Sequence, residues 1–207
     1  MIRHALPARV EVLDGPADPG LAPEGAAQAS QLAAGLADDR LAAVVSSPMR
    51  RARETADPLA SASGLAVETR DDLAEFDRAS SWYVPMEELR AERDPRWRAI
   101  IEGRWDEVYG VDLQTFQGAA VDAVESVIAD HPGGRVAVVT HGGVINAYVA
   151  RVVESRKAGI FEPGYTSVTR VLAARSGERT LRSLNDTSHL RPRAGEPATT
   201  GERITER

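Results

Sequence analysis

The apolar positions of the chain alternate between helical spacing and short unbroken runs. Helical spacing predicts helices at residues 24–36, 116–128 and 144–153. Apolar runs predict buried strands at residues 41–45 and, nearly all apolar, at 135–140. Residues 65–69 are a further plausible strand. A serine followed by a proline, at Ser47 and Pro48, predicts the start of a further helix that extends to about residue 60.

Two late strands, at 167–173 and 180–184, flank a short turn and predict a hairpin. Alternating strands and helices predict an α/β protein built as a three-layer α/β/α sandwich. Its central sheet should be mostly parallel, and the hairpin should give it an antiparallel edge strand. One domain over residues 1–190 accounts for this pattern.

Two segments depart from the alternation. The stretch from 73 to 113 is irregular and aromatic, and it contains all three tryptophans of the chain. We expect a helical cap insertion there, at about 74–113. The tail, residues 191–207, is rich in proline, glycine, threonine and charge, so we expect it to be disordered.

Composition narrows the class of protein. The chain has 207 residues and a formal net charge of -6, which argues against nucleic acid or an anionic membrane as the partner. It has no cysteine, and therefore no disulfide framework or thiolate nucleophile. No apolar run is long enough to cross a bilayer and no signal-like leader opens the chain, so we expect a cytoplasmic protein.

Polar residues follow three of the predicted strands. His4 comes where a first strand would end, Ser46 and Ser47 follow the second strand, and His141 follows the strongest one. Because ligands of α/β sheets bind beyond the carboxyl ends of the strands, these side chains should meet at one edge. Gly142 opens the next helix, and its free N–H group favours an anion.

These residue types suit the chemistry of a phosphoryl group. Arg3 and Arg51 offer the planar, permanently charged donors that phosphate prefers, although Arg51 could instead form a helix-surface ion pair with Glu54 or Glu75. A neutral histidine can attack phosphorus and form a phosphoramidate, while a second, cationic histidine stabilises the developing charge. A carboxylic acid must then protonate the leaving oxygen. Glu75 is the candidate, with Asp77 in reserve.

Four motifs in this order resemble the histidine phosphatase superfamily, the phosphoglycerate mutase-like proteins. Its R-H-G motif is similar to Arg3-His4-Ala5, its S-S-P-x-x-R-A-x-x-T-A motif to residues 46–56, its L-x-E motif to residues 73–75 and its V-x-H-G-G motif to residues 139–143. A weaker similarity, at residues 21–29, is to the family's L-T-x-x-G-x-x-Q-A helix entry.

The resemblance implies a role for each matched residue. It makes His4 the phosphorylated nucleophile, His141 the second catalytic histidine, Arg51 a phosphate-binding arginine and Glu75 the proton donor. Neither a metal nor another cofactor is expected, because the four histidines of the chain are scattered and none pairs at ligand spacing.

The chain also departs from the family pattern. Residues 6–10 replace a polar E-T-x-x-N stretch whose asparagine contacts phosphate in mutases, which weakens a mutase interpretation. Only Met1 and Ile2 precede Arg3, where the family has a full central strand. A two-residue strand would leave neighbouring backbone groups unpaired, at about 1–3 kcal/mol for each buried group. We therefore expect the true start to lie upstream.

The sequence thus predicts a metal-independent phosphomonoester hydrolase of the histidine acid phosphatase type, acting on a small phosphorylated substrate. Two alternatives remain. One is a phosphoglycerate mutase-type phosphotransferase, and the other is a non-catalytic member that binds phosphorylated ligands. The aromatic segment favours an apolar or ring-containing leaving group. The oligomeric state is open, and a homodimer is one possibility.

Overall fold

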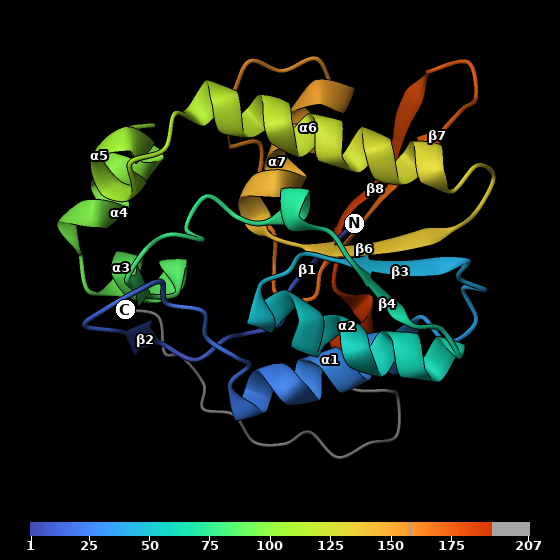
Figure 1. Cartoon of the computed structure of the whole chain (residues 1–207), viewed down its shortest axis with the longest axis horizontal. Coiled ribbons are helices and arrows are strands. Elements are labelled where there is room, and N and C mark those ends of the chain that lie inside the picture. Colours follow the sequence, from blue (N-terminus) through green and yellow to red (C-terminus); the bar gives the residue numbers. More distant parts are fainter. Residues whose placement is uncertain (158, 192–207) are drawn as a thin grey trace.

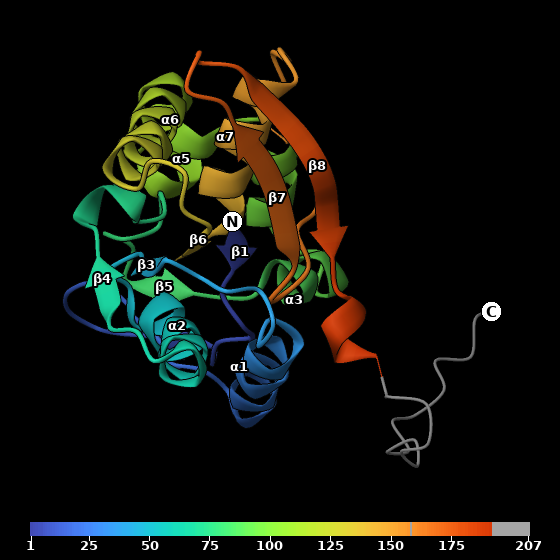
Figure 2. The ribbon, with the colours of Figure 1, turned by 90° about the vertical axis from the view of Figure 1, so that its right-hand side faces the viewer.

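A six-stranded mixed sheet forms the centre of the molecule, for which a computed structural model describes residues 1–157 and 159–191. The strand order is β4-β3-β6-β1-β7-β8. These strands are β1 (Ile2–Arg3), β3 (Ala43–Ser46), β4 (Val67–Thr69), β6 (Val136–Thr140), β7 (Val168–Ala173) and β8 (Arg179–Asp186). The first four strands in this order run parallel, whereas β7 runs antiparallel to both β1 and β8. The predicted mostly parallel sheet with a hairpin at its edge is confirmed (Figure 2).

Helices cover both faces of the sheet, as the three-layer prediction requires (Figure 1). One face is covered by α1 (Pro23–Gly35) and α2 (Arg50–Ser63), and the other by α6 (Leu113–Asp130) and α7 (Gly142–Val152). Two successive residues of β3 show why its sequence is mainly apolar: Val44 packs into the core under α1 and α2, and Val45 into the core under α6 and α7. A strand buried on both faces needs an unbroken apolar run.

The start of α2 differs from the prediction. Ser47 does not cap the helix, which begins at Arg50 with Met49 as the preceding residue and no side-chain cap. The hydroxyl of Ser47 instead forms a hydrogen bond with the Nε2 atom of His141, at 2.7 Å. The serine–proline pair therefore marks a turn between the strand and the helix rather than the first turn of the helix.

Residues 74–113, which we call the aromatic segment, contain three short helices. These are α3 (Met86–Ala91), α4 (Pro95–Ile101) and α5 (Trp105–Tyr109). They surround a small core of their own, formed by Val84, Leu89 and Ile100 and covered by aromatic side chains. This core explains why the tryptophans are concentrated here: each helix is too short to be stable without burying large side chains.

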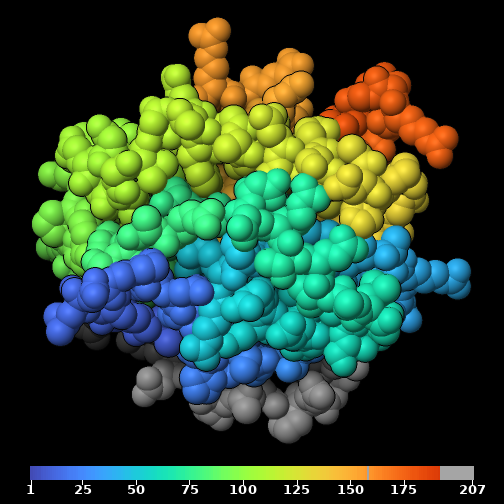
Figure 3. Space-filling model, viewed as in Figure 1, coloured from blue at the N-terminus to red at the C-terminus, as the bar shows by residue number. Residues whose placement is uncertain are grey.

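A second, two-stranded sheet joins the aromatic segment to the loop that follows β1. Its strands are β2 (Val10–Glu11) and β5 (Trp82–Tyr83), paired antiparallel. In the space-filling view the two regions form a continuous surface at one end of the molecule (Figure 3). The sequence did not predict this sheet, because two-residue strands have no alternation to recognise.

The remaining regular structure consists of 3₁₀ turns at Asp71–Leu73 and Ser188–Leu190. The tail predicted to be disordered begins at residue 191, and residues 192–207 lie outside the described part of the chain. Among the described helices, none combines the length and the apolar character that a membrane span requires.

Candidate functional site

Three neighbouring strands, β3, β6 and β1, end together at one edge of the sheet. The backbone N–H of His4 donates to the carbonyl of Thr140, at 2.9 Å, and that of Ser47 donates to the carbonyl of Val139, also at 2.9 Å. The polar residues that follow these strands are therefore brought together. His4 and His141, 137 positions apart in the sequence numbering, have ring centroids 5.1 Å apart.

His4 is buried with one ring nitrogen committed to the backbone. Its Nδ1 lies 2.8 Å from the carbonyl oxygen of Ala5, and because a carbonyl only accepts, Nδ1 carries the proton. The Nε2 lone pair is therefore available. Burial, and then the positive charges of Arg51 and Arg3, hold the pKa of His4 well below its usual value of 6.5, so the ring is neutral.

The loop after His4 is held by α1 and α2. The N–H of Ala5 donates to Thr55 Oγ1, and the N–H of Leu6 donates to Gln28 Oε1, both at 2.9 Å. Gly25 lets α1 approach this closely, since a Cβ there would lie 2.0 Å from the carbonyl oxygen of Leu6. The glycine and glutamine noted at 21–29 in the sequence therefore position the loop that carries His4.

His141 lies behind His4 and does not line the cavity described below. Its Nε2 contacts the Ser47 hydroxyl, while its Nδ1 is buried and has no hydrogen-bond partner among the described residues. Burial, and then the charges of Arg51, His4 and Arg3, hold the pKa of His141 well below 6.5. The lowered pKa favours a neutral His141 ring in this structure, whereas the sequence interpretation gives the second histidine a positive charge during phosphoryl transfer.

Arg51 is buried, with 1% of its surface exposed. Its Nη2 donates to both carboxylate oxygens of Asp77, at 2.8 and 3.0 Å. Its Nε and Nη1 have no partner within residues 1–157 and 159–191. The alternative of a surface ion pair with Glu54 or Glu75 is therefore wrong: the partner of Glu54 is Arg50. Asp77, the reserve proton donor, instead holds Arg51 in place.

Arg3 is also buried, at the side of the site formed by the loop before β7. Its guanidinium lies over the ring of Tyr165, with the central carbon 4.0 Å from the ring centroid, and donates to the carbonyl of Pro163. Its Nη1 is 3.7 Å from the carboxylate of Glu87, on α3. Tyr165 and Pro163 thus orient Arg3, a role that no sequence pattern indicated.

Glu75 is buried at the base of the aromatic segment. Its Oε2 accepts from the N–H of Gly143, at 2.8 Å, and its Oε1 from the N–H of Phe76, at 3.3 Å. Burial, and then the nearby Asp77, raise the pKa of Glu75 to about 7. This carboxyl can therefore both give and take a proton near neutral pH.

The second glycine of the His-Gly-Gly motif, Gly143, is required by its close contact with Glu75 and Phe76. A Cβ at this position would lie 2.3 Å from Glu75 Oε1 and 2.9 Å from the Phe76 ring, so only glycine allows the contact. At Gly142, by contrast, an added Cβ would meet no atom nearer than 4.0 Å, and the residue lines the cavity at the start of α7. The sequence pattern indicated Gly142 but not the positioning effect of Gly143.

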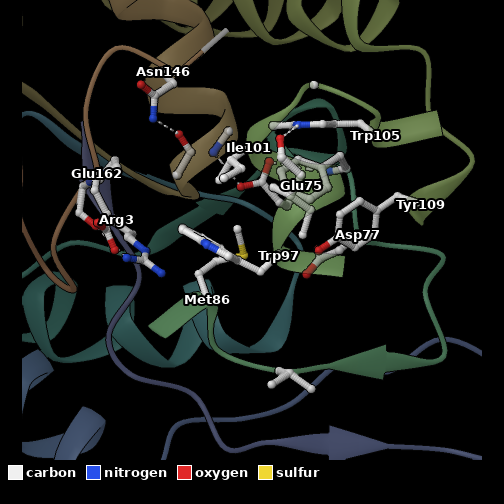
Figure 4. A pocket seen from close by; sticks show the side chains of 18 of the residues that line it. Arg3, Glu75, Asp77, Met86, Trp97, Ile101, Trp105, Tyr109, Asn146 and Glu162 are labelled. Atoms are coloured by element: carbon white, nitrogen blue, oxygen red, sulfur yellow. Dashed lines mark hydrogen bonds between the residues drawn. The ribbon is translucent and has the colours of Figure 1, made fainter. Parts of the chain in front are cut away.

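These residues lie at the base of a cavity of about 650 Å³. Arg3, His4, Arg51 and Glu75 line it, and the aromatic segment supplies most of its other walls (Figure 4). Asn146 of α7 closes one side: its side-chain amide donates to the carbonyl of Phe161, and its oxygen accepts from the N–H groups of Ile160 and Phe161. The loop at 159–161 is thereby fixed against the cavity.

Within the described part of the chain, no group of three or more His, Asp or Glu side chains is arranged to hold a metal ion. The charged groups at the cavity base are instead the two arginines and two carboxylates named above. Chemically, this arrangement combines guanidinium donors, an imidazole nitrogen with an available lone pair and a protonatable carboxyl.

The fold and the order of the sequence motifs point to one protein family. The chain belongs to the histidine phosphatase superfamily (branch 1), whose family model matches residues 1–187. The predicted family is therefore confirmed.

Two related proteins and one solved structure illustrate the similarity. The uncharacterized protein Rv0525 of Mycobacterium tuberculosis is 40% identical over 115 residues, which are 54% of this chain and 56% of that protein. The metal-independent phosphoserine phosphatase of Arabidopsis thaliana is 30% identical over 158 residues, 74% of this chain and 65% of that protein. The chain thus matches less than two thirds of the length of either relative.

The crystal structure of phosphoserine phosphatase from Entamoeba histolytica, in complex with 3-phosphoglyceric acid, superimposes with a TM-score of 0.72. The superposition covers 91% of this chain and 96% of that one, at 22% sequence identity. This similarity concerns the fold.

Proposed function

We propose that this protein is a metal-independent phosphomonoester hydrolase that forms a phosphohistidine at His4. One observation carries the proposal. Among the described residues, four buried polar side-chain atoms lack a hydrogen-bond partner, and three of them are Arg51 Nε, Arg51 Nη1 and His141 Nδ1. Leaving such atoms unpaired costs about 1–3 kcal/mol each, more for a charged group. A phosphoryl group bound beside His4 would give them acceptors.

In the first step, the Nε2 lone pair of His4 attacks phosphorus. The P–N bond forms as the bond between phosphorus and the leaving oxygen breaks. Arg3, Arg51 and the N–H of Gly142 bind the phosphoryl oxygens, and they provide the positive charge that this transfer requires. The lowered pKa of His4 supports this role, because a protonated imidazole could not attack.

Glu75 acts as the acid in this step and protonates the leaving oxygen. In the second step its carboxylate takes a proton from water, which attacks phosphorus, breaks the P–N bond and releases phosphate and free His4. The pKa of about 7 supports both roles, because the group changes charge near neutral pH. Asp77 is engaged by Arg51 through both oxygens, so we assign the acid to Glu75.

His141 does not line the cavity, but its Nδ1 is buried beside His4 without a hydrogen-bond partner among the described residues, and we propose that a phosphoryl group bound at His4 reaches this atom. A bound phosphoryl group carries negative charge, and this charge raises the pKa of a neighbouring imidazole. We therefore propose that His141 is neutral in the free protein and gains positive character when the phosphoryl group binds. The Ser47 hydroxyl, 2.7 Å from its Nε2, holds the ring in place.

The decisive experiment is hydrolysis of 4-nitrophenyl phosphate by the wild type, by His4→Ala and by a matched histidine variant, His131→Ala. His131 lies at the end of α6 and does not line the cavity. We expect His4→Ala to abolish turnover and His131→Ala to retain it, with both variants folded by circular dichroism. Turnover by His4→Ala would refute the phosphohistidine.

Two further measurements complete the test. Wild-type turnover should persist in a metal chelator, and loss of activity that added metal restores would refute metal independence. Glu75→Gln, mixed with ³²P-labelled 4-nitrophenyl phosphate and quenched in base, should trap label on His4, because the phenolate leaves without a proton while the second step, which needs Glu75 as the base, is slowed. If the wild type shows no turnover, and Glu75→Gln binds phosphate but never becomes labelled, the protein is a non-catalytic phosphate-binding member instead.

A further inference from the structure

The walls of the cavity above the phosphoryl-binding base are mostly aromatic and aliphatic. We call the part lined by Phe76, Trp97, Ile101, Trp105, Tyr109 and Phe161 the leaving-group pocket. From its size, surface and charge we infer that the protein selects phosphomonoesters whose leaving group is large, apolar and uncharged. This inference rests on the proposed function, because it concerns the alcohol that the phosphoryl transfer releases.

Size is the first argument. The cavity of about 650 Å³ lies within the range, about 300–1,000 Å³, of pockets that enclose ligands the size of a drug molecule. A phosphoryl group carrying a one- to three-carbon alcohol would contact the base of the cavity and leave the upper walls in water. A longer apolar group would cover them, and removing apolar surface from water favours binding.

The packing of the wall is the second argument. The Phe76 ring lies between Trp105 and Tyr109, with centroid distances of 4.2 and 4.8 Å. The Trp105 indole N–H donates to the carbonyl of Ile100, at 3.0 Å, so its polar atom is already satisfied. These rings hold one another in fixed positions, and the pocket is formed before a ligand arrives. Binding therefore does not require that they become ordered.

Exposed apolar surface at the mouth is the third argument. Ile101 ends α4 with 62% of its surface exposed, and it is among the lining residues. Figure 4 shows it among the residues that line the same cavity as Trp105 and Glu75. An alkyl or aryl chain that extends from the phosphoryl group past Glu75 would reach Ile101 and cover it.

Charge is the fourth argument. Beyond the groups assigned to the reaction and Asp77, which is paired with Arg51, the described charged residues of the lining are Glu102, Glu162 and Lys157. Two carboxylates against one ammonium group oppose a leaving group that carries its own carboxylate. Esters of small hydroxy acids should therefore be poor substrates, for a reason separate from their size.

The test compares methyl, butyl and hexyl phosphate with 3-phosphoglycerate. The three alkyl esters release alkoxides of similar basicity, so differences in kcat/KM report contact with the pocket. Each buried methylene contributes about fourfold, the equivalent of about 0.8 kcal/mol. We expect kcat/KM for hexyl phosphate to exceed that for methyl phosphate at least about 100-fold. It should fall at least about tenfold from butyl phosphate to 3-phosphoglycerate.

Ile101→Ser should lower the hexyl-to-methyl ratio of kcat/KM about three- to tenfold. Its matched control is Leu13→Ser, at an exposed apolar residue outside the lining, which should leave the ratio unchanged. A hexyl-to-methyl ratio near one, or a preference for 3-phosphoglycerate, overturns this inference while leaving the phosphohistidine mechanism intact. No turnover of any ester and no labelled His4 overturns the proposed function, and this inference with it.

Discussion

Replacing Gly143 with alanine should displace the Glu75 carboxyl, the proposed acid, while leaving the residues that bind the phosphoryl group in place. The new Cβ would lie 2.3 Å from Glu75 Oε1, where ordinary contacts are 3.4 Å or longer, so the carboxyl must retreat by about 1 Å or more. Phe76, whose ring would be 2.9 Å from the same Cβ, blocks one direction of escape. The hydrogen bond from the Gly143 N–H to Glu75 is then lost or distorted.

The expected loss follows from the role proposed for Glu75. A positioned general acid contributes about 10²–10⁴-fold, which corresponds to about 3–5 kcal/mol of transition-state stabilisation. We expect Gly143→Ala to lower kcat/KM for an alkyl phosphate by this factor. For 4-nitrophenyl phosphate the loss should be below about tenfold, because a stable phenolate leaves without a proton.

The assay is steady-state and burst kinetics with both esters. Since kcat/KM reports only the steps through formation of the phosphohistidine, a burst of nitrophenol followed by slow turnover would also reveal the loss of Glu75 as the base. Gly142→Ala is the control: its Cβ would approach no atom more closely than 4.0 Å and its N–H remains, so its loss should be smaller on both esters. Equal losses with the two esters, or no loss with either, would refute the reasoning.

Three other changes test separate parts of the structure. Because burial raises the pKa of Glu75 from 4.5 to about 7, wild-type kcat/KM for an alkyl phosphate should fall tenfold per pH unit above about 7. The folded protein binds the Glu75 proton more tightly than the unfolded chain, so the contribution of this group to the free energy of unfolding is complete below pH 4.5 and is lost as the pH rises to about 7. In urea denaturation, Glu75→Gln should reduce this loss by up to about 3 kcal/mol. Asp77→Asn leaves Arg51 without its carboxylate, and should lower the free energy of unfolding by about 3–5 kcal/mol. Inorganic phosphate should raise the melting temperature more in this variant than in the wild type, and an equal rise would contradict the pairing. Gly25→Ala places a Cβ 2.0 Å from the carbonyl oxygen of Leu6 and should lower the free energy of unfolding by about 1–3 kcal/mol. Gly118→Ala, in α6 with open space around it, should raise that free energy by up to about 1 kcal/mol. Similar changes in the two variants would refute the close approach of α1 to the loop.

The parts of the site that the sequence predicted are those fixed by parallel strands. His4, Ser47 and His141 each follow a strand, and the carboxyl ends of adjacent parallel strands necessarily share one edge. Their meeting therefore depends only on recognising the strands. The apolar runs within 41–45 and 135–140 identified the strands before Ser47 and His141, because a strand buried on both faces is largely apolar. The strand before His4 is too short for such a run, and His4 was recognised through the resemblance of Arg3-His4-Ala5 to the R-H-G motif.

The parts that it did not predict depend on irregular backbone. Asp77 reaches Arg51, and Glu75 reaches Gly143, through a stretch with no periodic pattern, so nothing in the spacing reveals which carboxylate faces which partner. The neutral state of His141 was missed for a different reason. It results from the sum of burial and three surrounding groups, and such a sum becomes known only when all of them are placed.

The aromatic segment carries both the carboxyl that we propose as the acid and the rings that face the departing alcohol. Glu75 and Phe76 are adjacent in the chain, and the Phe76 ring packs against Trp105 and Tyr109. The side chains proposed to contact the alcohol and the side chain proposed to protonate it therefore belong to one continuous stretch of backbone. Because the rings and the acid are fixed relative to each other, an alcohol that fits the rings poorly would hold its oxygen away from Glu75, so the proposed hydrolase would discriminate among esters through its rate as well as through its affinity. Changing its substrate range would require changing this segment as a unit, while the strands that carry the histidines stay as they are.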